Sequence, residues 1–169
     1  MRRSSPERWG GQALVEFTLV APMLFLLILG VFEGGRYVLF LETLANATRE
    51  GARFAIVNGE HVACPSGPLQ PPEVNTCDPA GDNVRLAVEQ AAMGLASMGA
   101  LTVHPPVWTN HGDFSPPQRG DPNTGYNARG DFVTVFVDYS YNSILTDIFG
   151  FRIIPPLSIS AESSLVVNY

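Results

Sequence analysis

The hydrophobic and polar positions divide the chain into an apolar run near its start and a longer mixed region after it. Residues 12–32 are predominantly apolar and contain one acidic residue, Glu16. At about 1.5 Å per residue, a helix over this run is about 30 Å long, which is enough to cross the hydrocarbon core of a bilayer. Pro22 lacks a backbone donor, so we expect a kink or a local loosening there. The pattern predicts a transmembrane helix over residues 12–32.

Helical periodicity continues beyond the apolar run, over residues 33–58. One face carries residues suited to a core: Tyr37, Phe40, Leu41, Leu44, Thr48, Phe54 and Ala55. A polar face carries Arg36, Glu42, Arg49, Glu50 and Arg53. Of these, Arg49, Glu50 and Arg53 fit either a solvated face or a docking surface. Asn58-Gly59 is a favourable end for a helix. We therefore expect the transmembrane helix to continue as the stem of an exported domain.

Residues 59–100 are expected to form a loop and a second helix. The loop, over residues 60–80, is rich in Pro, Gly, Asn and Ser. Gly81-Asp82-Asn83 is a capping sequence for a helix over Val84–Met98, which Gly99 ends.

The rest of the chain has the pattern of strands. Asp131–Tyr141 alternates strictly and is the clearest strand, and we expect its Val/Tyr face to pack on the stem. Leu157–Tyr169 alternates as well, while Leu101–Trp108 is a shorter strand that Pro105-Pro106 confines to a sheet edge or ends early. Between the last two strands, Ile144–Pro156 is an apolar excursion that fits core, a membrane surface or a neighbouring protein.

These elements predict an α+β fold. It has a long N-terminal transmembrane-to-stem helix, a second helix and a small antiparallel sheet of about three strands. The expected division is a cytoplasmic leader at 1–11, a transmembrane segment at 12–32, an exported helical stem at 33–58 and an exported α+β domain at 59–169.

The charge distribution sets the orientation of the chain. The formal net charge is −6, which makes nucleic acid an unsuitable partner because no basic face is available to neutralise phosphates. Arg2, Arg3 and Arg8 precede the apolar run, and most acidic residues follow it. The positive-inside rule therefore predicts a single-pass protein with a cytoplasmic N-terminus and an exported C-terminal domain.

Two cysteines, Cys64 and Cys77, lie on the expected exported side. A redox or metal role is the alternative to a disulfide, but the chain has no Cys-x-x-Cys motif. An even number of cysteines in an oxidising compartment is typical of a structural disulfide. We expect Cys64 and Cys77 to be bonded to each other.

Glu16 is costly in an apolar helix unless it has a partner. Cleavage after Gly11 would create an α-amino group at Gln12, largely protonated near pH 7 because its pKa is about 7.7–8.0. Glu16 lies one helical turn from that ammonium. This arrangement resembles type IV prepilins, in which a glycine precedes the cut, a glutamate is the fifth residue after it, and an aromatic residue, here Phe17, comes next.

Longer sequence motifs make the resemblance more specific. They are Gln12–Phe17, the apolar helix with Pro22, Gly30-Val31-Phe32-Glu33-Gly34-Gly35-Arg36 and Ala45-Asn46-Ala47-Thr48-Arg49-Glu50-Gly51-Ala52-Arg53-Phe54-Ala55. Together they resemble the TadE-like pseudopilins of the tight-adherence (Flp) pilus system. The resemblance covers the first third of the chain.

The resemblance implies a minor pseudopilin-like component, matured by a prepilin peptidase, that primes, caps or assembles a Tad/Flp-type pilus. Its implied partners are the peptidase, other pilins or pseudopilins and inner-membrane assembly proteins. The implied location is the bacterial inner membrane, with association with the pilus as a further expectation. A major pilin fits less well, because Flp-type major pilins are little more than the helix. The alternative is an uncleaved membrane-tethered exported binding module.

Catalytic and ligand-binding motifs are absent from the sequence, so we expect no enzyme, no cofactor and no metal. His104, His111 and Asp113 are possible metal ligands, but their loop setting favours surface residues. The polar loop over residues 109–129 is long enough to be either functional or flexible, and it is the ligand site in the alternative function. Its Asp121–Gly125 stretch resembles a calcium loop but lacks the later bidentate Glu.

Overall fold

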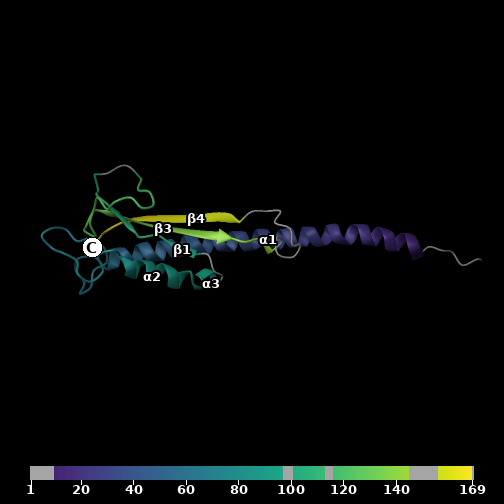
Figure 1. The fold of residues 1–169 in the computed structure, drawn as a ribbon, viewed down its shortest axis with the longest axis horizontal. Coiled ribbons are helices and arrows are strands. Elements are labelled where there is room, and N and C mark those ends of the chain that lie inside the picture. The colour runs from purple at the N-terminus through teal and green to yellow at the C-terminus, as the bar shows by residue number, and fades with distance from the viewer. Residues whose placement is uncertain (1–9, 97–100, 113–115, 145–155, 169) are drawn as a thin grey trace, which may run out of the picture.

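Helix α1 (Gly10–Val57) is the axis of the molecule, as the computed structural model of residues 10–96, 101–112, 116–144 and 156–168 shows. Its N-terminal half projects beyond the rest of the fold, and its C-terminal half lies between a sheet and helix α2 (Figure 1). The helix continues through Pro22 and ends one residue before Asn58-Gly59. A single element thus connects the apolar run to the domain.

Six further elements complete the described fold. They are α2 (Asp82–Ala91), α3 (Met93–Ala96), β1 (Leu101–Val103), β2 (Val107–Thr109), β3 (Phe132–Tyr141) and β4 (Leu157–Val166). The predicted α+β class, with a long N-terminal helix, a further helix and a small antiparallel sheet, is confirmed. The described sheet has four strands where about three were expected.

Strand β3 is the centre of the sheet. It pairs along its whole length with β4, from Phe132 opposite Val166 to Tyr141 opposite Leu157. Its other edge pairs with β2 at one end and β1 at the other. The single strand expected over 101–108 is therefore two short strands, because Pro105-Pro106 interrupts the ladder between them.

The stem buries one side of α1 against the sheet and another against α2. Its buried residues are Phe40, Leu44, Ala47, Thr48, Gly51, Ala52 and Ala55. The ring of Phe40 lies edge-on to Tyr139 and Tyr141, with centroids 5.4 Å apart in each pair, so the Val/Tyr face of β3 packs on the stem as expected. Leu41 is exposed, contrary to the prediction, although Thr48, two turns further along the same side of α1, is fully buried.

Gly51 allows α1 and α2 to approach closely. A Cβ atom at this position would clash with the side chain of Val88, which is fully buried on α2. Ala47, Ala52 and Ala55 are small buried residues on the same helix. Small side chains thus let one helix pack against elements on two sides.

The second helix is shorter than the sequence predicts. It ends at Ala91, and Ala92, with φ −97° and ψ 19°, separates it from the single turn of α3. Residues 97–100 lie outside the described residues. The expected cap is also different, because Gly81 has φ 73° and no side chain that could accept the first helical N–H groups.

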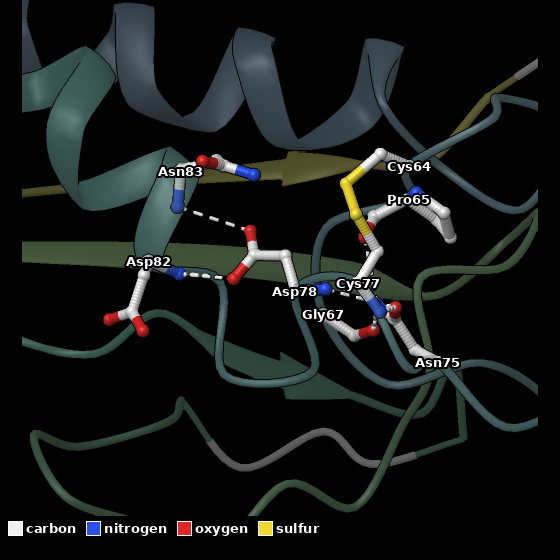
Figure 2. Close-up of a disulfide and its surroundings, with 8 residues drawn as sticks. All are labelled: Cys64, Pro65, Gly67, Asn75, Cys77, Asp78, Asp82 and Asn83. Carbon is white, nitrogen blue, oxygen red and sulfur yellow. Dashed lines mark hydrogen bonds between the residues drawn. A yellow bond between two sulfur atoms is a disulfide. The ribbon is translucent and has the colours of Figure 1, made fainter.

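Asp78 supplies that cap from the disulfide loop (Figure 2). Its Oδ1 and Oδ2 accept hydrogen bonds from the backbone N–H groups of Asp82 at 2.6 Å and Asn83 at 3.1 Å. Cys64 and Cys77 form the expected disulfide in this loop. Asn75 fixes the loop between them, because its side chain donates to the carbonyls of residues 65 and 67 and accepts from the N–H groups of residues 77 and 78.

Candidate functional site

The predicted processing residues lie together at the start of α1. Gly11, Gln12, Glu16 and Phe17 are all exposed on this helix. The Gln12 side-chain amide donates to the Glu16 carboxylate at 3.4 Å, so the two residues lie one turn apart on the same face. Cleavage after Gly11 and the role of Glu16 stay predictions.

The helix that carries these residues has an uncovered apolar surface. Its most apolar stretch has a mean hydropathy of 2.4, and none of that stretch is buried in the fold. Leu14, Phe17, Leu27 and Phe32 are all more than half exposed. By length and composition α1 can therefore cross a membrane, and a lipid environment would remove the cost of exposing this surface to water.

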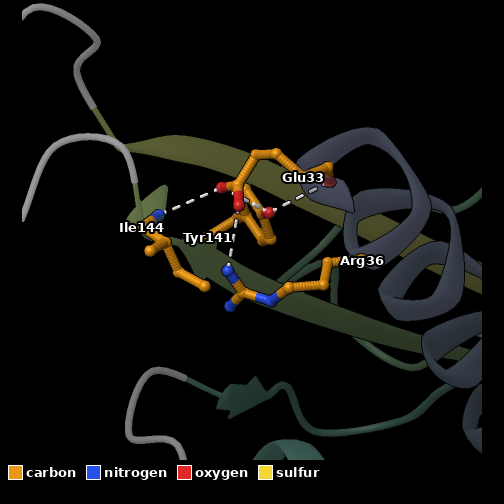
Figure 3. A network of polar contacts seen from close by, with 4 residues as sticks. All are labelled: Glu33, Arg36, Tyr141 and Ile144. Atoms are coloured by element: carbon orange, nitrogen blue, oxygen red, sulfur yellow. Dashed lines mark hydrogen bonds and ion pairs between the residues drawn. The ribbon is translucent and has the colours of Figure 1, made fainter. Parts of the chain in front are cut away.

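A polar cluster lies where this apolar stretch meets the domain (Figure 3). The Oε1 atom of Glu33 accepts hydrogen bonds from the Tyr141 hydroxyl at 2.7 Å and from the Ile144 N–H at 3.1 Å. Its Oε2 atom pairs with Arg36 at 3.1 Å. The Arg36 guanidinium also lies 5.5 Å from the ring centroids of Phe40 and Tyr141.

This cluster joins the first helix to the end of the central strand. Burial, with the hydrogen bond and charge of Glu33, raises the pKa of Tyr141 to about 12. The phenol is therefore protonated at neutral pH and acts as the donor to the carboxylate. Glu33 and Tyr141 were not predicted as partners, because no local periodicity connects positions so far apart in sequence.

The residues considered as metal ligands lie at separate places. His104 Nε2 is 2.8 Å from Asp138 Oδ2, whereas His111 stacks on Phe132 with ring centroids 6.0 Å apart. Asp113 lies outside the described residues. Within the described ranges, no group of three or more His, Cys, Asp or Glu is arranged to hold a metal ion.

Asp138 is the centre of a second polar cluster, on the sheet. It accepts hydrogen bonds from Arg119 at 2.6 Å and Ser160 at 2.7 Å in addition to its contact with His104. Burial raises the pKa of Asp138, but the hydrogen bonds from Ser160 and His104 and the charges of Arg119 and His104 outweigh it, so the pKa is lowered. Because the Ser160 hydroxyl donates to the carboxylate of Asp138, Ser160, Asp138 and His104 do not form a nucleophile activated by an imidazole.

Part of the long loop is held by the core. The side chain of Asn127 is buried and donates to the carbonyls of Ala55 at 2.9 Å and Ser66 at 2.6 Å. Trp108 accepts backbone hydrogen bonds from Thr124 and Gly125. The Asn123 side-chain oxygen, part of the stretch that resembles a calcium loop, accepts from the Trp108 N–H at 3.1 Å. This part of the loop therefore has a structural role.

Comparison with known protein families gives a match on the helix that carries the predicted processing residues. Residues 11–53 match the family model of TadE-like proteins. The resemblance expected from the sequence is confirmed over this TadE-like segment. The segment begins at Gly11, includes Glu16, Glu33 and Gly51, and lies entirely within α1. No curated protein and no solved structure matches the chain.

Proposed function

We propose that this protein is a minor pseudopilin-like component of a Tad/Flp-type pilus assembly system. The observation that carries the proposal is the TadE-like match over residues 11–53, because it begins at the glycine that would precede the cut. The exposed apolar helix that bears this segment supports the same role. The role is priming, capping or assembly of the pilus and involves no catalysis.

Processing creates the charge that Glu16 requires. A prepilin peptidase cuts between Gly11 and Gln12 and leaves an ammonium on Gln12. Glu16 lies one turn further along the helix, within reach of this ammonium or that of a neighbouring subunit. Leaving either charge buried without its partner would cost several kcal/mol, so the pair favours ordered packing of subunits in the membrane or fibre.

The topology of the proposal is a single pass through the bacterial inner membrane. The N-terminus is cytoplasmic because Arg2, Arg3 and Arg8 precede the apolar run. The disulfide between Cys64 and Cys77 is consistent with export, because disulfides persist in oxidising compartments. The proposed division keeps the leader at 1–11, the span at 12–32, the stem at 33–58 and the exported domain at 59–169.

The partners follow from this location. The prepilin peptidase acts at the leader, and other pilins, pseudopilins and inner-membrane assembly proteins contact the helix or the exported domain. The domain formed by α2 and the sheet exceeds what a helix-only pilin requires, which supports a minor assembly role over that of the major fibre subunit.

Glu16→Ala tests the proposal in a host that assembles the pilus. We expect normal processing and membrane insertion but a clear loss of pili or of pilin co-purification, because the ammonium loses its partner. Val20→Ala is the matched control, since Val20 lies one turn further along the exposed surface and carries no charge. Normal pili and normal partner recovery with Glu16→Ala would instead favour an uncleaved membrane-tethered binding module.

A further inference from the structure

The exposed apolar surface of α1 does not stop at Glu33. Val38 is 55% exposed and Leu39 is 60% exposed, compared with 61% for Leu27 in the middle of the apolar run. Leu41 is also exposed. On the side of the helix that carries Val38 and Leu39, the surface changes at Glu42 and continues with Asn46 and Arg49, all exposed. The boundary between apolar and polar surface therefore lies between Leu41 and Glu42.

The length of the helix agrees with this boundary. A bilayer core about 30 Å thick takes about twenty helical residues, which reach Arg36 when counted from Phe17. The headgroup layers extend the bilayer to about 40–45 Å in total, or about 5–7 Å further on each side. Val38, Leu39 and Leu41 fall in that outer layer when Glu16 lies at the opposite surface.

Glu33 and Arg36 are charged, and charged groups are costly to place in a bilayer unless they have partners. In the structure both groups have partners. Each pairs with the other at 3.1 Å, and the second Glu33 oxygen is occupied by Tyr141 and Ile144. Arg36 lies over two aromatic rings. Both charged groups are therefore partnered on the side facing the sheet, which lowers the cost of removing them from water.

The sheet adds apolar and aromatic groups at the same end of the domain. Leu157 is exposed at the start of β4 and pairs in register with Tyr141 at the end of β3. Tyr37 and Tyr141 lie edge-on with ring centroids 5.6 Å apart. Tyrosine is enriched where a protein crosses the boundary between hydrocarbon and water. We call Val38, Leu39, Leu41 and Leu157 the apolar collar.

We propose that the apolar collar lies in the interfacial layer of the bilayer and contacts lipid. The exported domain then rests against the membrane surface, and the lipid-facing surface of α1 ends at Leu41, about two and a half turns beyond the end of the predicted span. The collar is continuous with the exposed surface of the apolar helix, so lipid covers both without a second protein. The inference rests on membrane anchoring by α1 and is independent of cleavage at Gly11.

Nitroxide labels on the full-length protein in phosphatidylcholine vesicles test whether the apolar collar contacts lipid. Both native cysteines are in the disulfide, so Leu39→Cys and Asn46→Cys introduce one free thiol each. The two positions lie on the same side of α1, two turns apart, and both are exposed. A high lipid-to-protein ratio keeps the copies apart, and Leu27→Cys reports whether α1 is inserted.

Collision of each label with oxygen and with a water-soluble nickel chelate distinguishes the outcomes. We expect the oxygen-to-nickel collision ratio to be several-fold higher at Leu39 than at Asn46 and highest at Leu27. A ratio at Leu39 equal to that at Asn46 would place the collar in water and overturn the proposal. Weak collision with both reagents at Leu39 would show that a second copy covers it, which also contradicts lipid contact. A water-like ratio at Leu27 would overturn the anchoring as well.

Discussion

The hydroxyl of Tyr141 donates a hydrogen bond to the carboxylate of Glu33 over 2.7 Å, although 108 residues separate them in sequence. The bond connects the helix turn at the end of the apolar run to the last residue of β3. Together with the ion pair between Arg36 and the other carboxylate oxygen, this bond holds the sheet to the first helix where the apolar run meets the domain.

Tyr141→Phe should destabilise the domain by about 1–3 kcal/mol, because it removes a donor from a partly buried carboxylate. The free energy of unfolding in detergent micelles, measured by denaturant titration, checks this. Tyr126→Phe is the control, since Tyr126 lies in the loop before β3, away from Glu33. Equal stability of wild type and Tyr141→Phe would show that the contact contributes nothing.

Asp78→Ala should cost about 1 kcal/mol, within the range for loss of a helix N-cap, because the first N–H groups of α2 lose their acceptor. Asp82→Ala is the control: Asp82 is exposed and forms only a surface ion pair with Arg85, which is worth about 0–1 kcal/mol. The loss with Asp78→Ala should also persist at high salt. A larger effect from Asp82→Ala would mean that the cap is assigned to the wrong carboxylate.

The disulfide should contribute about 3 kcal/mol by restricting the unfolded chain, in the loop-entropy account. Reductant should lower the stability of the wild type to that of the Cys64→Ser/Cys77→Ser double variant and leave the double variant unchanged. Thermal unfolding with and without reductant makes the comparison. Unchanged stability of the reduced wild type would contradict a structural role for the disulfide.

Asp138 should make stability depend on acid pH. Its pKa in the folded protein lies below the ordinary value of 3.8, so its contribution is present above pH 3.8 and is lost as the pH falls through the lowered pKa. Below pH 3.8 the stability of wild type should therefore fall more steeply than that of Asp138→Asn, in denaturant titrations at successive pH values. Parallel curves would show that other carboxyl groups account for the acid sensitivity.

Long periodic segments were the part of the fold that the sequence could predict. The helix over the apolar run and stem, and the strands ending at Tyr141 and beginning at Leu157, have patterns that persist over many residues. Helical spacing predicts that Leu41 belongs to the core-facing side of the stem. Its exposure, on the same side of α1 as the buried Thr48, shows that periodicity cannot tell how far along a helix the rest of the fold covers it.

Breaks at single residues and contacts between elements far apart in the sequence could not be predicted from the periodic pattern. The break at Ala92 has no local sequence signal, and the split at Pro105-Pro106 depends on both pieces pairing with the same strand. Asp78 reaches the helix start because Gly81 turns the chain with a positive φ. Tyr141 could be assigned to the stem-facing side of its strand, but its bond to Glu33 depends on register between distant elements. Ile144 was placed in an apolar excursion that, over 145–155, lies outside the described residues.

The intact mass of the protein purified from its native membrane tests most directly whether this chain is a prepilin-class subunit. We expect a mass that corresponds to a chain starting at Gln12, with or without a methyl group on its new N-terminus. Gly11→Leu should retain the leader, because the peptidase pocket must accept the residue before the cut. A wild-type protein that retains residues 1–11, or a Gly11→Leu protein that still has the shortened mass, would contradict the account.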